Sequence, residues 1–257
     1  MKHLTLGHRL PHLLSAPLFG DRARFGLVVQ AEDPCWREWQ KTYLDFYFST
    51  QKQSVGKVVN DAGYSVMSRL DLTGKQVLEV GPGDINHIGC WRSTPARYVI
   101  ADIQQAMLAF SSRKLSARGI PHECRLLERG DLGVLPFEDG QFDFIVSFYS
   151  LEHLYPLATY VDGMLRVLKP GGVLAGAIPA EGGLGWGLGR FLTSRRWLKR
   201  NTGINPDKLI CWEHPNFADH ILATLDGRMR RQYLGFWPLA IPSIDLNLVI
   251  KFVYAKR

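Results

Sequence analysis

Two common kinds of site are missing from this sequence of 257 residues. The four cysteines Cys35, Cys90, Cys124 and Cys211 are far apart and form no Cys-x-x-Cys pair, so we expect neither a metal site nor a disulfide framework. This cysteine usage fits a cytoplasmic location. The glycine-rich run 181–189 is not followed by Gly-Lys-Ser/Thr, which excludes a P-loop.

Long apolar runs are also absent, so no segment is expected to span a bilayer. The apolar stretch 10–19 contains Pro11 and Pro17 and lacks a small-residue cleavage pattern after it, which disfavours a secretory signal. The formal charge of +7 is by itself an argument about non-specific attraction, so nucleic acid is not the expected partner. With 46% hydrophobic residues the chain can bury a sizeable core, as one domain with an elaboration.

The chain is organised around residues 76–84, Gln-Val-Leu-Glu-Val-Gly-Pro-Gly-Asp. A short apolar run with β-branched residues that ends in Gly81 and Gly83 predicts a buried strand followed by a tight turn. Glycine lets the main chain approach a ligand closely, and a helix over 85–91 would present its N-terminus to a carboxylate or phosphate. We therefore expect a ligand at this turn.

A second candidate ligand residue, Asp102, ends the apolar run 97–101 about twenty residues further on, where nucleotide-binding α/β folds place the acid that binds ribose hydroxyls. A dinucleotide fingerprint needs a third glycine, and Asn86 stands in its place. Glu79, an acid inside the strand, belongs to a different pattern. A nicotinamide oxidoreductase is therefore disfavoured.

Five motifs in order carry a resemblance to a known family. They are Glu-Val-Gly-Pro-Gly at 79–83, Asp102, Asp131-Leu132, Phe-Asp-Phe-Ile-Val-Ser at 142–147 and Leu-Lys-Pro-Gly-Gly at 168–172. Together they resemble the class I S-adenosylmethionine-dependent methyltransferases, particularly the group that includes the quinone-biosynthesis type. The resemblance covers roughly residues 72–179. One departure is Ile85, where many members have a further glycine.

The resemblance implies S-adenosyl-L-methionine as cofactor and S-adenosyl-L-homocysteine as product. The cofactor-binding residues that it implies are Glu79, Gly81, Pro82, Gly83, Asp102, Ile103, Asp131, Leu132 and Ser147. Glu79 would orient the glycine loop or reach the methionine amine, and Asp102 would take the ribose hydroxyls. Asp131 and Leu132 would meet the adenine, and Ser147 would lie near the methionine end.

Strands and helices alternate from residue 76 to residue 178, which implies parallel pairing with right-handed crossovers. We expect an α/β, Rossmann-like, doubly wound sheet of seven mostly parallel strands with an antiparallel C-terminal strand. Residues 1–71 are expected to form an N-terminal arm, loop-rich up to residue 33, and cap helices. Residues 72–257 are the expected methyltransferase domain, with an insertion at 181–227 after the fifth strand.

Aromatic residues recur at helical spacing before this domain: Trp36, Trp39, Tyr43, Phe46 and Tyr47. We expect most of them to pack on the sheet and some to line an acceptor site.

The insertion combines glycines, a basic cluster from Arg190 to Arg200, and the flat rings of Trp186, Trp197 and Trp212. Two interpretations are equally open: a lid over an anionic or sugar-like acceptor, and a surface insertion with solvated charges.

Candidates for a general base are His153, after the fourth strand, and His214, which follows Glu213. A histidine has the near-neutral pKa that suits proton removal from a hydroxyl, although His153 could equally be a structural residue at a helix start.

The function expected from the sequence is methyl transfer to a small-molecule, glycan or lipid-linked acceptor, with oxygen as the favoured atom. The alternatives are a quinone C-methyltransferase, a nucleic-acid methyltransferase and a cofactor-binding module without catalysis.

Overall fold

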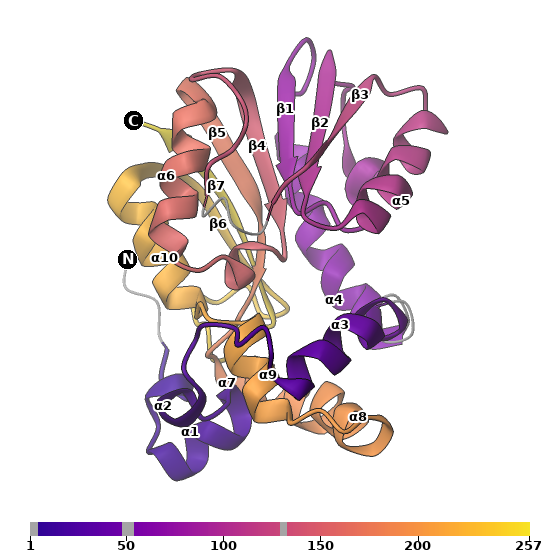
Figure 1. Cartoon of the computed structure of the whole chain (residues 1–257). Coiled ribbons are helices and arrows are strands. Elements are labelled where there is room, and N and C mark those ends of the chain that lie inside the picture. Colours follow the sequence, from indigo (N-terminus) through magenta and orange to yellow (C-terminus); the bar gives the residue numbers. More distant parts are fainter. Residues whose placement is uncertain (1–4, 48–53, 129–132) are drawn as a thin grey trace.

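The fold is an α/β sheet of seven strands in the order β3-β2-β1-β4-β5-β7-β6 (Figure 1). A computed structural model describes residues 5–47, 54–128 and 133–257. The strands are β1 (Gln76–Val80), β2 (Arg97–Asp102), β3 (His122–Leu126), β4 (Phe142–Phe148), β5 (Leu168–Pro179), β6 (Met229–Trp237) and β7 (Val249–Lys256). β7 runs antiparallel to its two neighbours, and β1 to β5 pair in parallel. The predicted fold class is confirmed.

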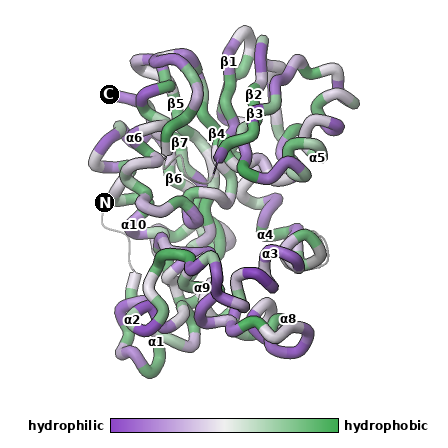
Figure 2. Tube along the Cα trace, in the orientation of Figure 1, coloured by the Kyte–Doolittle hydropathy of each residue, from purple (hydrophilic) through white to green (hydrophobic). Residues whose placement is uncertain are grey.

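The centre of the sheet is β1, which pairs with β2 on one side and β4 on the other. The winding of the chain reverses here, and ligands of such sheets bind beyond the carboxyl ends of the strands at this reversal. Val77 and Leu78 are fully buried on opposite faces of the sheet. The hydrophobic colour accordingly runs along the central strands in Figure 2.

Helices cover both faces of the sheet. One face carries α4 (Ser54–Tyr64), the 3₁₀ helices η3 (Ser65–Arg69) and η4 (His87–Cys90), and α5 (Gln105–Ser116). The other carries the 3₁₀ helix η5 (Leu151–His153), α6 (Leu157–Val167) and α10 (Ala218–Arg228). Each face encloses its own cluster of buried apolar side chains, which fixes the register of the strands between them.

A separate group of helices lies beyond the carboxyl ends of the strands (Figure 1). It comprises η1 (Gly7–Arg9), α1 (His12–Phe19), α2 (Arg22–Phe25), α3 (Pro34–Phe46), α7 (Leu184–Leu192), α8 (Ser194–Asn201) and α9 (Pro206–Glu213). We call residues 5–47 and 184–213 the cap. Its core consists of Trp36, Trp39, Phe46, Leu198, Ile204, Leu209, Cys211 and Trp212. The N-terminal segment and the insertion thus share one small core.

Three expectations about local structure were wrong. Residues 5–33 were expected to be loop-rich, but they contain α1 and α2, which pack against α7 and α9. Tertiary contacts of this kind override a weak helical pattern. The aromatic side chains of α3 pack mainly on α8 and α9 rather than on the sheet.

In the described part of the chain, no helix is both long and apolar enough to cross a bilayer.

The third correction concerns the segment after the glycine turn. A helix was expected over 85–91, but the structure has only the four-residue η4. Ile85, which stands where many family members have glycine, takes a φ of 40° and is almost fully buried. A β-branched residue in this left-handed region is strained, and the turn that it forms delays the start of the helix.

Candidate active site

The turn after β1 is a tight glycine loop. Gly81 and Gly83 have φ values of 70° and 56°, in the region that favours glycine. A Cβ atom on Gly81 would lie 2.6 Å from Ser150 Oγ, and one on Gly83 would lie 2.8 Å from the Tyr47 hydroxyl. The main chain is therefore held between two polar side chains and leaves no room for substitution.

Glu79, in β1 just before this loop, is fully buried, and both of its carboxylate oxygens are hydrogen-bonded. One carboxylate oxygen accepts from His87 Nε2 at 2.8 Å, and the other accepts from the Tyr98 hydroxyl at 2.8 Å. His87 Nδ1 in turn accepts from Trp91 Nε1 at 2.9 Å. Because both Glu79 oxygens are engaged and Glu79 does not line the cavity, the geometry favours loop orientation over contact with a methionine amine.

Asp102 ends β2 beside the glycine loop and lines the same cavity. Its carboxylate accepts from the Gln104 backbone N–H at 2.8 Å. Burial raises the pKa of the Asp102 carboxyl to about 6, although nearby backbone N–H groups oppose the shift. Ile103, 42% exposed, also lines the cavity.

The other predicted cofactor residues are placed differently. Pro82 lines the cavity with its two glycine neighbours. Asp131 and Leu132 lie outside the described residues. Ser147 is buried in β4 and does not line the cavity, whereas Ser150, three residues later, does. Of these two serines, Ser150 is therefore the one that lies at the cavity.

The cavity extends from the glycine loop to the cap and has a volume of about 1380 Å³. A site for one drug-sized ligand commonly has about 300–1,000 Å³, so a cofactor and an acceptor fit together. Its wall includes every aromatic residue singled out in the sequence: Trp36, Trp39, Tyr43, Phe46, Tyr47, Trp186, Trp197 and Trp212. The cap therefore supplies a largely aromatic roof.

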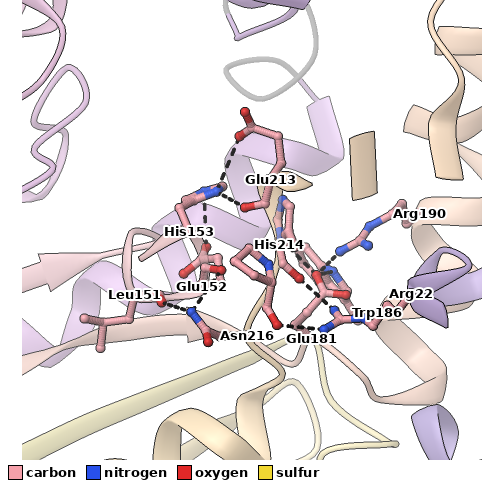
Figure 3. Close-up of polar contacts among 11 residues, drawn as sticks. Arg22, Leu151, Glu152, His153, Glu181, Trp186, Arg190, Glu213, His214 and Asn216 are labelled. Carbon is pink, nitrogen blue, oxygen red and sulfur yellow. Dashed lines mark hydrogen bonds and ion pairs between the residues drawn. The ribbon is translucent and has the colours of Figure 1, made fainter. Parts of the chain in front are cut away.

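His153 lies under this roof between two carboxylates (Figure 3). Its Nδ1 hydrogen-bonds the backbone oxygen of Glu213 and lies 3.4 Å from Glu213 Oε2. A carbonyl oxygen can only accept, so Nδ1 carries the proton and the neutral ring keeps its lone pair on Nε2. Nε2 is 3.9 Å from Glu152 Oε1. Glu213 is itself held by Trp39 Nε1 at 2.8 Å.

Glu152 is a buried acid that the sequence analysis did not select. Only 2% of it is exposed, it lines the cavity, and its Oε2 has no hydrogen-bond partner among the described residues. Burial raises its pKa to about 7. Its position directly before His153 was the only signal in the sequence, and adjacency alone does not predict burial.

A second buried cluster surrounds Glu181. Its Oε2 accepts from Trp186 Nε1 at 2.9 Å and from Arg190. His214 Nδ1 lies 2.9 Å from the same oxygen. Burial and the neighbouring arginine hold the pKa of His214 well below its usual range, so His214 is neutral at pH 7 and a weak base. Of the two predicted bases, the geometry favours His153.

Arg195 has a different role from the one that its place in the basic cluster indicated. It is buried and forms two hydrogen bonds to Asp207, at 2.7 and 3.1 Å, so its charge is neutralised inside the cap. Arg196 is exposed on the same helix. Neither open interpretation of the basic cluster, as charges that face an acceptor or as solvated charges, therefore holds for Arg195.

Arg195→Ala should lower the free energy of unfolding by about 2–3 kcal/mol, because it leaves Asp207 without its partner in a site only partly open to water. Arg196→Ala is the matched control and should change stability by less than about 0.5 kcal/mol. Thermal and urea unfolding of the two variants measures the difference. Equal stabilities would show that the ion pair does not hold the cap together.

The residues present fit the proposed cofactor. The loop at Gly81 and Gly83 leaves space for an extended chain, Asp102 offers an acceptor for paired hydroxyls, and the side chains of Met107 and Leu135 give apolar wall for a planar ring. Across the described ranges, no three His, Cys, Asp or Glu side chains are placed to hold a metal ion.

Comparison with known proteins agrees with this arrangement. Residues 78–176 match the family model described as a methyltransferase domain. The chain is 37% identical over 102 residues to the ubiquinone/menaquinone biosynthesis C-methyltransferase UbiE of Idiomarina loihiensis, covering 38% of this chain and 40% of that protein. It is 33% identical over 112 residues to a fatty-acid O-methyltransferase of Mycolicibacterium smegmatis, covering 42% and 39%.

The fold has a counterpart among solved structures. A SAM-dependent methyltransferase from Aquifex aeolicus aligns with a TM-score of 0.51 at 15% identity, over 79% of this chain and 94% of that one. The sequence matches are shorter than this structural match. The chain spans about half or less of the length of the curated relatives that it matches. The matched segment includes the glycine loop, Asp102 and His153. The chain thus carries a class I S-adenosylmethionine-dependent methyltransferase domain, and S-adenosyl-L-methionine is the cofactor of this domain.

Proposed function

We propose that this chain transfers a methyl group to a hydroxyl oxygen of a small-molecule, glycan or lipid-linked acceptor bound under the cap. The observation that carries the proposal is His153, whose Nδ1 is fixed by Glu213 and whose Nε2 is left for the cavity beside buried Glu152. The bound cofactor supplies a methyl group already activated on a sulfonium.

His153 acts as the general base in this proposal. Its Nε2 takes the hydroxyl proton while the acceptor oxygen forms its bond to the methyl carbon and the bond from carbon to sulfur breaks. The imidazolium that results lies between the Glu152 and Glu213 carboxylates, which stabilise its charge. The glycine loop and the aromatic roof align the two reactants and exclude water.

The relatives differ in the atom that they methylate, as their names state a C-methyltransferase and an O-methyltransferase. A quinone-type carbon is therefore the second candidate acceptor. Two acidic groups beside one histidine, one of them with a pKa near 7, favour removal of a hydroxyl proton. The aromatic roof suits a sugar face or an acyl chain, and the large cavity admits either.

A labelled-methyl screen tests this function. The protein is incubated with methyl-tritiated S-adenosylmethionine and with lipid, glycan and polar fractions of a cell extract. We expect label in one class of fraction and none in nucleic acid. Tight binding of S-adenosylhomocysteine without transfer to any fraction would instead indicate a cofactor-binding module.

A further inference from the structure

The helix α7 has two faces with different surroundings. Trp186 and Arg190, one turn apart, line the cavity, and Gly187 packs against Phe19 of α1. The remaining face points away from both. Leu188 and Leu192, also one turn apart, are 50% and 52% exposed, and Phe191 between them is 37% exposed. α7 therefore has an apolar outer face that is about half exposed.

The next helix, α8, has a basic outer face. Arg195 and Leu198 are buried toward the cap, whereas Arg196, Lys199 and Arg200 are exposed at spacings of three and four residues. Such spacing places the three cations side by side on the helix. None of them forms an ion pair with a carboxylate in the described part of the chain. In Figure 2, α8 accordingly includes a hydrophilic stretch.

From this arrangement we propose that the outer faces of α7 and α8 dock on an anionic lipid bilayer. We call Leu188, Phe191, Leu192, Arg196, Lys199 and Arg200 the docking face. Interfacial helices bury apolar side chains at the boundary between headgroups and acyl chains, and they place Lys and Arg against the negative surface. The docking face supplies both kinds of group on consecutive helices, and the chain as a whole carries a formal charge of +7.

Charge complementarity favours a bilayer over a second copy of this chain. Two copies that met symmetrically through α7 and α8 would bring six unpaired cations together, and like charges across an interface oppose association. α1, which packs on α7, adds two further exposed apolar residues, Leu13 at 86% and Leu14 at 58%. An apolar surface beside unpaired cations matches an anionic lipid surface.

The docking face also lies close to the cavity. Thr193 and Ser194, at the junction of α7 and α8, line the cavity, and so does the opposite face of α7. One helix thus separates the surface that we assign to lipid from the site that we assign to the acceptor. This proximity would let an acceptor enter from the membrane surface, but the docking itself does not depend on the proposed function.

Co-sedimentation with phospholipid vesicles tests the docking. The protein should bind vesicles that contain about 30% phosphatidylglycerol, bind weakly to pure phosphatidylcholine, and dissociate at high salt. Replacing Arg196, Lys199 and Arg200 together by alanine should lower partitioning about 100-fold, since each cation near such a surface contributes about 1 kcal/mol. Replacing Leu188 and Leu192 by serine should lower it about tenfold or more.

The control replaces three exposed cations far from the cap, Arg92, Arg113 and Arg118, by alanine, and it should keep wild-type partitioning. All variants should keep the wild-type melting temperature, because every substituted side chain is exposed. Equal binding to neutral and anionic vesicles, or no binding to either, would overturn the proposal. So would a dimer in sedimentation velocity that Leu188→Ser and Leu192→Ser dissociate, because the face would then join two copies.

Discussion

Asp102→Asn should lower the affinity for S-adenosylhomocysteine by about 2–3 kcal/mol, a factor of roughly 30–150, and yet stabilise the ligand-free protein. The carboxylate lines the cavity beside the glycine loop and is the acceptor that we assign to the ribose hydroxyls. Hydrogen bonds to a charged acceptor have this magnitude. Calorimetric titration of the two proteins at pH 7.5 measures the loss, and unchanged affinity would remove Asp102 from the site.

The gain in stability follows from the raised pKa of Asp102, which is about 6 in the folded chain. An acid whose pKa is higher when folded stabilises the fold at low pH and loses that contribution as the pH rises through 6. Above pH 6 the asparagine variant should therefore unfold at a higher temperature than the wild type, and below about pH 4 the two should coincide.

The matched control is Asp143→Asn in β4, since Asp143 does not line the cavity. Asp143 accepts from the Gln76 backbone N–H at 2.9 Å and pairs with Lys169, and these contacts lower its pKa. The same substitution there should destabilise the protein at neutral pH, an effect that disappears as the pH falls, and should leave cofactor affinity unchanged. A change in stability of the same sign in Asp102→Asn and Asp143→Asn at neutral pH would contradict this account of the charges.

His153→Ala should lower turnover by about 10²–10⁴-fold and leave binding of S-adenosylhomocysteine nearly intact. Removal of a positioned general base has an effect of this size, and the described polar contacts of His153 are with Glu152 and Glu213, not with the glycine loop or Asp102. Single-turnover methyl transfer and calorimetry on the same protein give both quantities. Loss of cofactor affinity together with activity would mark His153 as structural.

The pH profile identifies the part that Glu152 plays. Its pKa of about 7 means that the carboxyl group is mostly protonated and neutral below pH 7 and mostly charged above it. Because the charged form supports an imidazolium at His153, the rate should rise with pH through 7. Glu152→Gln should lower the rate above pH 7 and reduce the size of this rise, whereas His220→Ala, on an exposed part of α10, should keep both. A rise of undiminished size in Glu152→Gln would assign the pH dependence to another group.

Much of the fold could be predicted because its signals are local. The strand at 76–80, its glycine turn and Asp102 stand within thirty residues, and period and spacing are enough to place them at one edge of a parallel sheet. The alternation of strands and helices up to residue 178 follows from the same kind of pattern.

The cap and the base could be predicted only in part because they depend on distant contacts. His153 and Glu213 are 60 positions apart, and Trp39 and Glu213 are 174 apart. Nothing in the sequence around Glu213 indicates that it meets either residue. Burial, which raises the pKa of Glu152 and encloses Arg195, is likewise a property of the assembled cap.

The most direct test of the central claim is to find which atom receives the methyl group. The protein is supplied with S-adenosylmethionine that carries a ¹³C-methyl group and with the extract fraction that accepts label, and the product is analysed by carbon NMR. We predict a ¹³C signal in the methoxy region from the wild-type protein and a signal at least about 100-fold slower to appear with His153→Ala. A methyl signal on carbon or nitrogen, or an equal rate with His153→Ala, would contradict the assignment of a hydroxyl acceptor and a histidine base.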